Sequence, residues 1–326
     1  MTRGGVSVVC GLIFFAMFGV LTSCARGGAD AASFPSRNIT MIIPFAVGGG
    51  TDVLGRALAS GMERELGRRV IVVNRPGNNG IVGIEETLRA RPDGYTLVIL
   101  TNNDQGILLE TEPDLSFSFD DFRYVAGINT TAMVLVASRD SGIESMEDLR
   151  RMALENPGRI TASVSAPNHL VQAIQLMQVM GINVTPVMRH SGNESALAIM
   201  GNHVDVAILA ARFSNQIEYV GGRTLGVFSP ERFPEVPHVP TMMEQGINLA
   251  DEIIRLVAVH RDVPDEIVTI LESTIKEVVN SELYINALIA LNEIAKFTSS
   301  EEITASMRSY MEEVRVIVRE NPEAFL

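Results

Sequence analysis

The sequence predicts an α/β fold, because short buried strands alternate with amphipathic helices along most of its length. Residues 39–43 and 70–73 are apolar and rich in β-branched side chains, as buried strands are. Residues 53–69 lie between them and carry apolar side chains at the spacing of one helix face. The crossover of this unit is expected to be right-handed. A chain of 326 residues is long enough for two lobes built from such units.

The rest of the chain continues the same alternation. Further strands are predicted at residues 96–100, 122–128, 133–137, 160–164, 184–188, 204–209, 225–228 and 253–259. Helices are predicted at residues 84–90, 145–155, 168–180, 195–200, 264–279, 282–291 and 300–320. The polar stretch 101–105 is interpreted as a loop.

The composition argues against several classes of function. The formal net charge of -13 disfavours nucleic acid as a partner and favours a soluble chain that repels its own copies, so a monomer is expected. Any attraction for an anionic ligand must then be local. The five histidines show no metal-ligand spacing, and no G-x-S-x-G motif is present. We therefore expect neither an enzyme nor a bound cofactor.

Residues 1–24 are interpreted as a secretory signal that lies outside the fold. Arg3 supplies positive charge, and residues 6–20 form an apolar run too short for a stable membrane anchor. The segment Leu-Thr-Ser before Cys24 resembles the bacterial lipobox, which implies a diacylglycerol on the Cys24 sulfur. The alternative is a plain secretory signal with an incidental cysteine. Residues 25–33 are expected to be a flexible tether, so the protein would be a lipid-anchored extracytoplasmic one.

Three consecutive glycines, Gly48, Gly49 and Gly50, follow the first strand. Without a Cβ they let the backbone approach a ligand closely. Thr51 or Asp52 is expected to cap the next helix, whose free N–H groups and dipole favour an anion in the loop. The loop is therefore a candidate cradle for a carboxylate or phosphate. An ordinary tight turn is the alternative that the glycines alone leave open.

Polar residues also follow the predicted strand at 96–100, and Asn102 is a candidate ligand contact there. In an open α/β sheet, ligands bind beyond the carboxyl ends of the strands. Residues 74–83 form a second glycine-rich loop after another strand. These loops are expected to lie near the first one.

Three motifs occur in series near the N-terminus. They are Pro44-Phe45 with Gly48-Gly49-Gly50-Thr51-Asp52, Val73-Asn74-Arg75-Pro76-Gly77 with Gly80 and Gly83, and Pro92-Asp93-Gly94-Tyr95-Thr96-Leu97. Together they resemble the Bug/TctC family, the substrate-binding receptors of tripartite tricarboxylate transporters. Weaker motifs later in the chain agree with this resemblance. It covers about residues 34–322.

The resemblance implies a two-lobed periplasmic-binding-protein fold of type II, a Venus flytrap with two hinge crossings. Lobe one would comprise residues 34–138 and 254–326, and lobe two residues 139–253. A small carboxylate would lie against the glycine loop in the cleft, and the lobes would close around it. Membrane transporter subunits of the TctA and TctB kind would then receive the ligand. A receptor for a sensor kinase, or a binder of another kind of solute, stays open.

The resemblance also implies ligand contacts in the second lobe. Residues 163–169 look shorter than the family's usual segment but keep Asn168 and His169 at a helix start. Arg189-His190 stands where the family usually has an aromatic and a basic residue, and Arg189 would grip a second carboxylate. An acid that often follows the strand at 204–209 is absent, which favours a di- or tricarboxylate over an amino acid. The candidate ligand residues are Phe45, Ala46, Gly48, Gly49, Gly50, Thr51, Asp52, Asn102, Ser165, Asn168, His169, Arg189 and Ser191.

Overall fold

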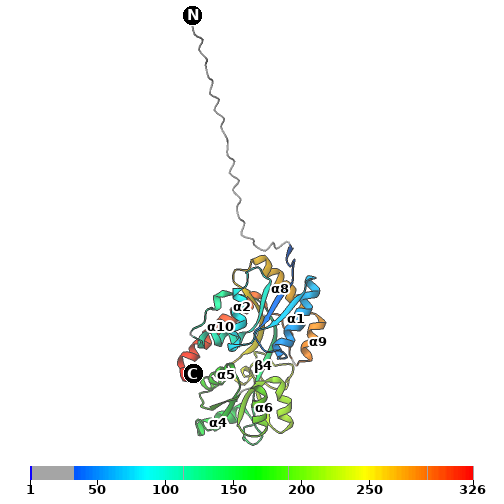
Figure 1. Ribbon diagram of the computed structural model, residues 1–326. Helices are drawn as coiled ribbons and strands as arrows, with labels where there is room; N and C mark the ends of the chain where they lie inside the picture. The colour runs from blue at the N-terminus through cyan, green and yellow to red at the C-terminus, as the bar shows by residue number, and fades with distance from the viewer. Residues whose placement is uncertain (2–32, 113, 190, 292, 326) are drawn as a thin grey trace.

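The computed structural model describes residues 1, 33–112, 114–189, 191–291 and 293–325. The Cys24 lipidation site, almost all of the predicted signal and tether, and His190 lie outside these residues. Among the described residues, no helix is both long enough and apolar enough to cross a membrane. The described chain forms two α/β lobes, drawn one above the other in Figure 1.

One long strand, β4 (Phe122–Ala137), belongs to the sheets of both lobes. In the first lobe the strand order is β2-β1-β3-β9-β4. β1 pairs in parallel with β2 and β3, whereas β9 runs antiparallel to β3 and β4. The bounds of these strands are β1 Ile39–Ile43, β2 Val70–Asn74, β3 Thr96–Thr101 and β9 Glu252–His260.

Within β4 the pairing changes from one lobe to the other. The strand pairs with β9 as far as Ala132, and from Met133 onward it pairs with β7 and β8. The prediction of two separate strands is wrong here. Residues 129–131 are polar, but they continue the ladder to β9 and so keep the strand unbroken. The two lobes are therefore joined by one extended ribbon of backbone.

In the second lobe a parallel core of strands is bordered by antiparallel ones. β5 pairs in parallel with both β6 and β7, and β4 runs antiparallel to β7 and β8. The alternation of strands and helices predicted from the sequence is confirmed in this region. The strands are β5 Thr161–Val164, β6 Thr185–Met188, β7 Val206–Ala210 and β8 Arg223–Val227.

Helices cover both faces of the first-lobe sheet. α1 (Gly50–Leu66), α8 (Asp265–Val279) and α9 (Glu282–Ile289) bury one apolar face. α2 (Ile81–Arg89), α3 (Asn102–Thr111) and α10 (Ser300–Glu320) bury the other. The prediction of a loop at 101–105 is wrong, because residues 102–105 form the first turn of α3. Burial of Leu108 beside Met311 of α10 stabilises this helix despite its polar start.

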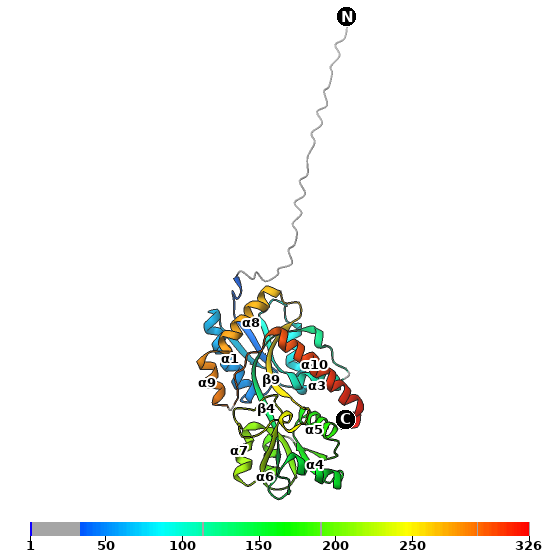
Figure 2. The same cartoon turned by 180° about the vertical axis from the view of Figure 1, so that it is seen from behind.

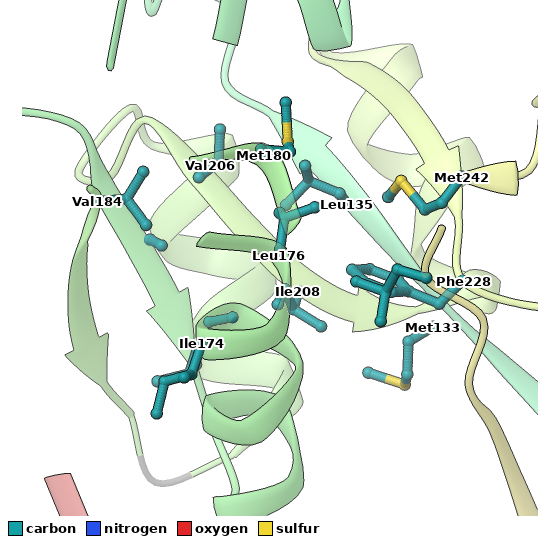
Figure 3. Close-up of a cluster of buried hydrophobic side chains, with 14 of the residues drawn as sticks. Met133, Leu135, Ile174, Leu176, Met180, Val184, Val206, Ile208, Phe228 and Met242 are labelled. Atoms are coloured by element: carbon teal, nitrogen blue, oxygen red, sulfur yellow. The ribbon is translucent and has the colours of Figure 1, made fainter. Parts of the chain in front are cut away.

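The second lobe is layered in the same way. α4 (Met146–Glu155) and α5 (Pro167–Met180) pack on one face, while α6 (Gly192–Met200) and the unpredicted short α7 (Ser214–Tyr219) pack on the other. Figure 3 shows side chains of α5 meeting those of the sheet. The labelled members of this cluster are Met133, Leu135, Ile174, Leu176, Met180, Val184, Val206, Ile208, Phe228 and Met242.

The last helix contacts both lobes. α10 lies along the first lobe and reaches down to the second, as Figure 2 shows. Tyr310, Val314 and Ile317 belong to the same buried cluster as α5. Gln178 of α5 also donates to the Glu320 carboxylate over 3.1 Å. α10 is therefore a further link between the lobes, in addition to the chain crossings.

Candidate functional site

The glycine loop joins the end of β1 to the first turn of α1. Gly49 is the N-cap, with φ -72° and ψ 164°, and no side chain caps the helix. The prediction that Thr51 or Asp52 provides the cap is wrong, because the helix begins at Gly50 and places both inside its first turn. Within the part of the chain that the structure describes, no side chain caps the first-turn N–H groups. Gly48 has φ +83°, a conformation that glycine adopts at little cost.

Asp52 holds this loop in shape from inside the protein. Its carboxylate accepts hydrogen bonds from the Gly48 N–H (2.9 Å), the Arg56 Nε (3.1 Å) and the Asn74 Nδ2 (2.9 Å). Burial alone would raise the pKa of Asp52, but these donors outweigh it and hold the pKa below its usual value. Asn74 also donates to the Phe45 carbonyl. The geometry favours the interpretation of Asp52 as a loop brace.

A second uncapped helix start comes from the other lobe. Ala166 is the N-cap of α5, Pro167 is its first residue, and no side chain caps it. The His169 Nδ1 accepts from the Ser165 N–H at 3.3 Å and lies 3.0 Å from the Ser165 hydroxyl. Burial lowers the pKa of His169 to about 4, so the ring is neutral at pH 7. With Nδ1 as the acceptor, the proton is on Nε2, which is a donor.

A cavity of about 350 Å³ lies where the two lobes meet at these loops. It is bordered by the glycine loop, the second glycine-rich loop, α3 and the start of α5. Apolar side chains dominate its wall. Pro167 at the start of α5 is one of the lining residues, whereas Phe45 and Ala46 come from the loop that leads to α1. The lining residues are Pro44, Phe45, Ala46, Pro76, Gly77, Asn79, Gly80, Ile107, Leu108, Thr111 and Pro167.

Of the predicted ligand residues, only Phe45 and Ala46 line this cavity. Three of the others have contacts that place them elsewhere. The Asn102 side chain donates to the Glu252 carbonyl (2.9 Å) and accepts from the Ile254 N–H (2.8 Å), so its amide is used within the protein. The Ser191 hydroxyl caps α6 by accepting from the Glu194 N–H. Arg189 lines a separate hollow beside α6, together with Glu194, Leu197, Ala198 and His203.

A charged network lies behind the glycine loop and was not predicted from the sequence. Arg255 of β9 donates from Nε to the Thr51 hydroxyl (3.0 Å) and from Nη1 to the Glu293 carboxylate (3.0 Å). Asn129 of β4 donates to the same carboxylate over 2.7 Å. These residues are far apart in the sequence, and only an arginine within an apolar strand could have drawn attention to the site.

A part-buried aspartate, Asp251, connects α3 and α5. The Asp251 carboxylate accepts from the Gln172 Nε2 (2.6 Å) of α5 and the Asn103 Nδ2 (3.2 Å) of α3. Burial raises the pKa of Asp251 to about 6, even though these two donors lower it. Asp251 therefore links α3 to α5, two helices that contribute residues to the cavity wall.

Comparisons with known proteins agree with this geometry. A family described as tripartite tricarboxylate transporter family receptor, TctC, matches residues 54–314. A UPF0065 protein of Bordetella pertussis is 31% identical over 227 residues, which cover 68% of this chain and 70% of that protein. The protein BugT of the same species is 26% identical over 316 residues, 92% of this chain and 94% of BugT.

Solved structures share the fold. A TctC solute-binding protein from Polaromonas superposes with a TM-score of 0.80 at 24% identity, covering 88% of this chain and 99% of that protein. MatC of Rhodopseudomonas palustris with bound malate gives 0.69 at 19% identity, covering 87% of this chain and 100% of MatC. Another R. palustris protein, with adipate, gives 0.71 at 23% identity, covering 88% and 97%.

Proposed function

The chain belongs to the tripartite tricarboxylate transporter receptor family, TctC, whose members are extracytoplasmic solute-binding receptors rather than enzymes, and on this premise we propose its ligand and its partner. The ligand is a small organic acid with two or more carboxylates. It binds in the cavity between the lobes and passes to the membrane subunits of a tripartite transporter. No cofactor takes part.

One observation carries this proposal: the cavity is lined by Phe45 and Ala46, which precede the uncapped start of α1 in one lobe, and by Pro167, the first residue of the uncapped α5 in the other. Free N–H groups and the positive end of the helix dipole stabilise an anion. Two such ends suit a molecule that carries a carboxylate at each end, and the apolar wall suits a carbon chain between them. Malate and adipate, bound in two proteins of this fold, have that form.

The lobes would close around the ligand by bending at the crossings between them. We assign residues 34–138 and 254–326 to lobe one and residues 139–253 to lobe two. The last residues of β4, from Met133, pair with the second-lobe sheet. The first crossing therefore lies within β4, a few residues before the boundary at 138.

Attachment of a lipid to Cys24 would keep the receptor near its membrane. A tethered receptor has a high local concentration, so weak docking to the transporter suffices for delivery. The receptor would act as a monomer. Delivery to a sensor kinase instead of a transporter is the second candidate, because both partners would recognise the same closed form.

Ligand binding to the soluble chain from Ala25 onward tests the proposal. We expect malate, adipate or citrate to raise the melting temperature, because a ligand that binds only the folded state stabilises it by mass action. Glucose and spermidine are matched controls without a carboxylate. A shift with either control and with none of the acids would contradict the proposal.

Substitution of Gly49 tests the role of the α1 start. The backbone of Gly49 suits aspartate, so Gly49→Asp places a carboxylate on the free N–H groups. The unliganded protein should gain about 1 kcal/mol from the new cap, while affinity for the acid falls at least about tenfold because the ligand's place is taken. Gly49→Ala is the control and should retain most of the affinity.

A further inference from the structure

Arg255 brings a second positive group to the start of α1. Its side chain is only 13% exposed. Nε and Nη1 are used by Thr51 and Glu293, whereas Nη2 has no hydrogen-bond partner among the described residues. Nη2 would lie 3.4 Å from a Cβ built on Gly50. Because a helical Cβ points toward the N-terminus, Nη2 sits beside the free first-turn N–H groups.

Arg255 and the N-terminal end of α1 together concentrate positive charge at one place. A cation beside a helix N-terminus is unfavourable, because the dipole already gives that end a partial positive charge. Asp52 lies in the same turn, but its charge is paired with Arg56. Glu293 is the only carboxylate that contacts Arg255 within the described residues, and it also accepts from Asn129. Among the described residues, the guanidinium thus has one carboxylate partner and the first turn of α1 beside it has no side-chain acceptor, which leaves the place open to a further anion.

We propose that Arg255 is a specificity-determining residue, whose Nη2 donates to an ionised carboxylate of the ligand at the start of α1. Thr51 and Glu293 hold the guanidinium so that Nη2 faces the first-turn N–H groups. This inference rests on the proposed function and identifies the ligand group at this end as a charged carboxylate. Hydrogen bonds between two charged groups are about twice as strong as neutral ones.

The test compares two substitutions with opposite effects on local charge. Arg255→Gln removes the charge and should weaken binding of the tightest of malate, adipate and citrate by about ten- to a hundredfold. Glu293→Gln keeps an oxygen for Arg255 and Asn129 but removes a negative charge, so it should tighten binding a few-fold. Isothermal titration calorimetry of the soluble chain from Ala25 measures both.

Salt dependence provides the second readout. Wild-type affinity should fall with rising salt because charged contacts are screened, and Arg255→Gln should reduce that dependence. Arg255→Lys keeps the charge and should show a wild-type salt dependence with a few-fold weaker binding. This variant also keeps the test valid if Arg255→Gln does not fold.

The outcomes separate the two claims. If Arg255→Gln and Glu293→Gln both weaken binding and leave the salt dependence unchanged, Arg255 is only a brace for α1 and the inference is wrong. In that case the proposed function still stands, because the wild-type protein binds the acid. If the wild-type protein binds none of the three acids, both the proposed function and this inference fail.

Discussion

Two aspartates, Asp52 beside the glycine loop and Asp251 between α3 and α5, both accept hydrogen bonds, yet the protein shifts their pKa values in opposite directions. At Asp52, burial is outweighed by the Arg56 guanidinium, the Gly48 N–H and the Asn74 amide, and the pKa is lowered. At Asp251, burial outweighs two neutral amide donors and the pKa rises to about 6. The carboxylates of Glu313 and Glu252 add to that rise.

The comparison teaches that the charge of the donors matters as much as their number. The lowered pKa of Asp52 favours its charged form, which accepts hydrogen bonds from the glycine loop. Ionisation of the Asp251 carboxyl is unfavourable in the folded protein, so this group binds a proton in mild acid. The glycine loop is therefore held by charged contacts, whereas the connection between α3, α5 and β9 responds to pH.

The largest effect is expected when Asp52 is removed. Asp52→Ala leaves the Gly48 N–H and the Asn74 amide without their acceptor, so the free energy of unfolding should fall by about 3 kcal/mol. Urea denaturation at pH 7 measures it. Asp52→Asn is the matched control and should lose about half as much, since it keeps one acceptor oxygen. Equal losses would show that charge is unimportant at this position.

A substitution of Asp251 is expected to change the free energy of unfolding in the opposite direction. Its folded pKa lies above the unfolded value, so its contribution to stability is full below about pH 4 and is lost as the pH rises through about 6. Asp251→Asn lacks this loss and should be more stable than wild type by about 2 kcal/mol at pH 8, with no gain at pH 4. Unfolding curves across this range measure the difference. A pH-independent effect would contradict the assignment.

The smallest effect is expected from a donor to Asp251. Gln172→Leu removes the 2.6 Å hydrogen bond between α5 and Asp251 and should cost about 1 kcal/mol at pH 8. The cost should shrink at pH 4, where the carboxyl is neutral and a weaker acceptor. Repeating the substitution in the Asp251→Asn background is the control, and an unchanged cost there would separate Gln172 from the charge of Asp251.

Much of the fold can be predicted from the sequence, because the local hydrophobic patterns and the tertiary packing favour the same helices and strands. β1, α1 and β2 have the predicted order, and α10 begins and ends at the predicted residues. The errors arise where tertiary contacts override local pattern. The polar residues 102–105 form a helix because α3 packs against α10, and residues 129–131 remain in a strand because β9 pairs with them.

The site is less predictable than the fold. The glycine loop is visible because three consecutive glycines stand between a predicted strand and a predicted helix, although the glycines alone also suit an ordinary tight turn. The partners of the loop are not visible, since Thr51 meets Arg255 across 204 positions and Asp251 meets Gln172 across 79. Single charged residues in strands and loops have no periodic signature, so their pairing emerges only when the chain is folded.

The reach of α10 into both lobes has a consequence for biosynthesis. Tyr310, Val314 and Ile317 complete the buried cluster of the second lobe, although that lobe's other residues are synthesised much earlier. β9 and α8 likewise complete the first lobe from the second half of the chain. A nascent chain emerging from the ribosome therefore cannot complete the first core before β9 and α8 are synthesised, nor the second before α10 is synthesised, which delays folding.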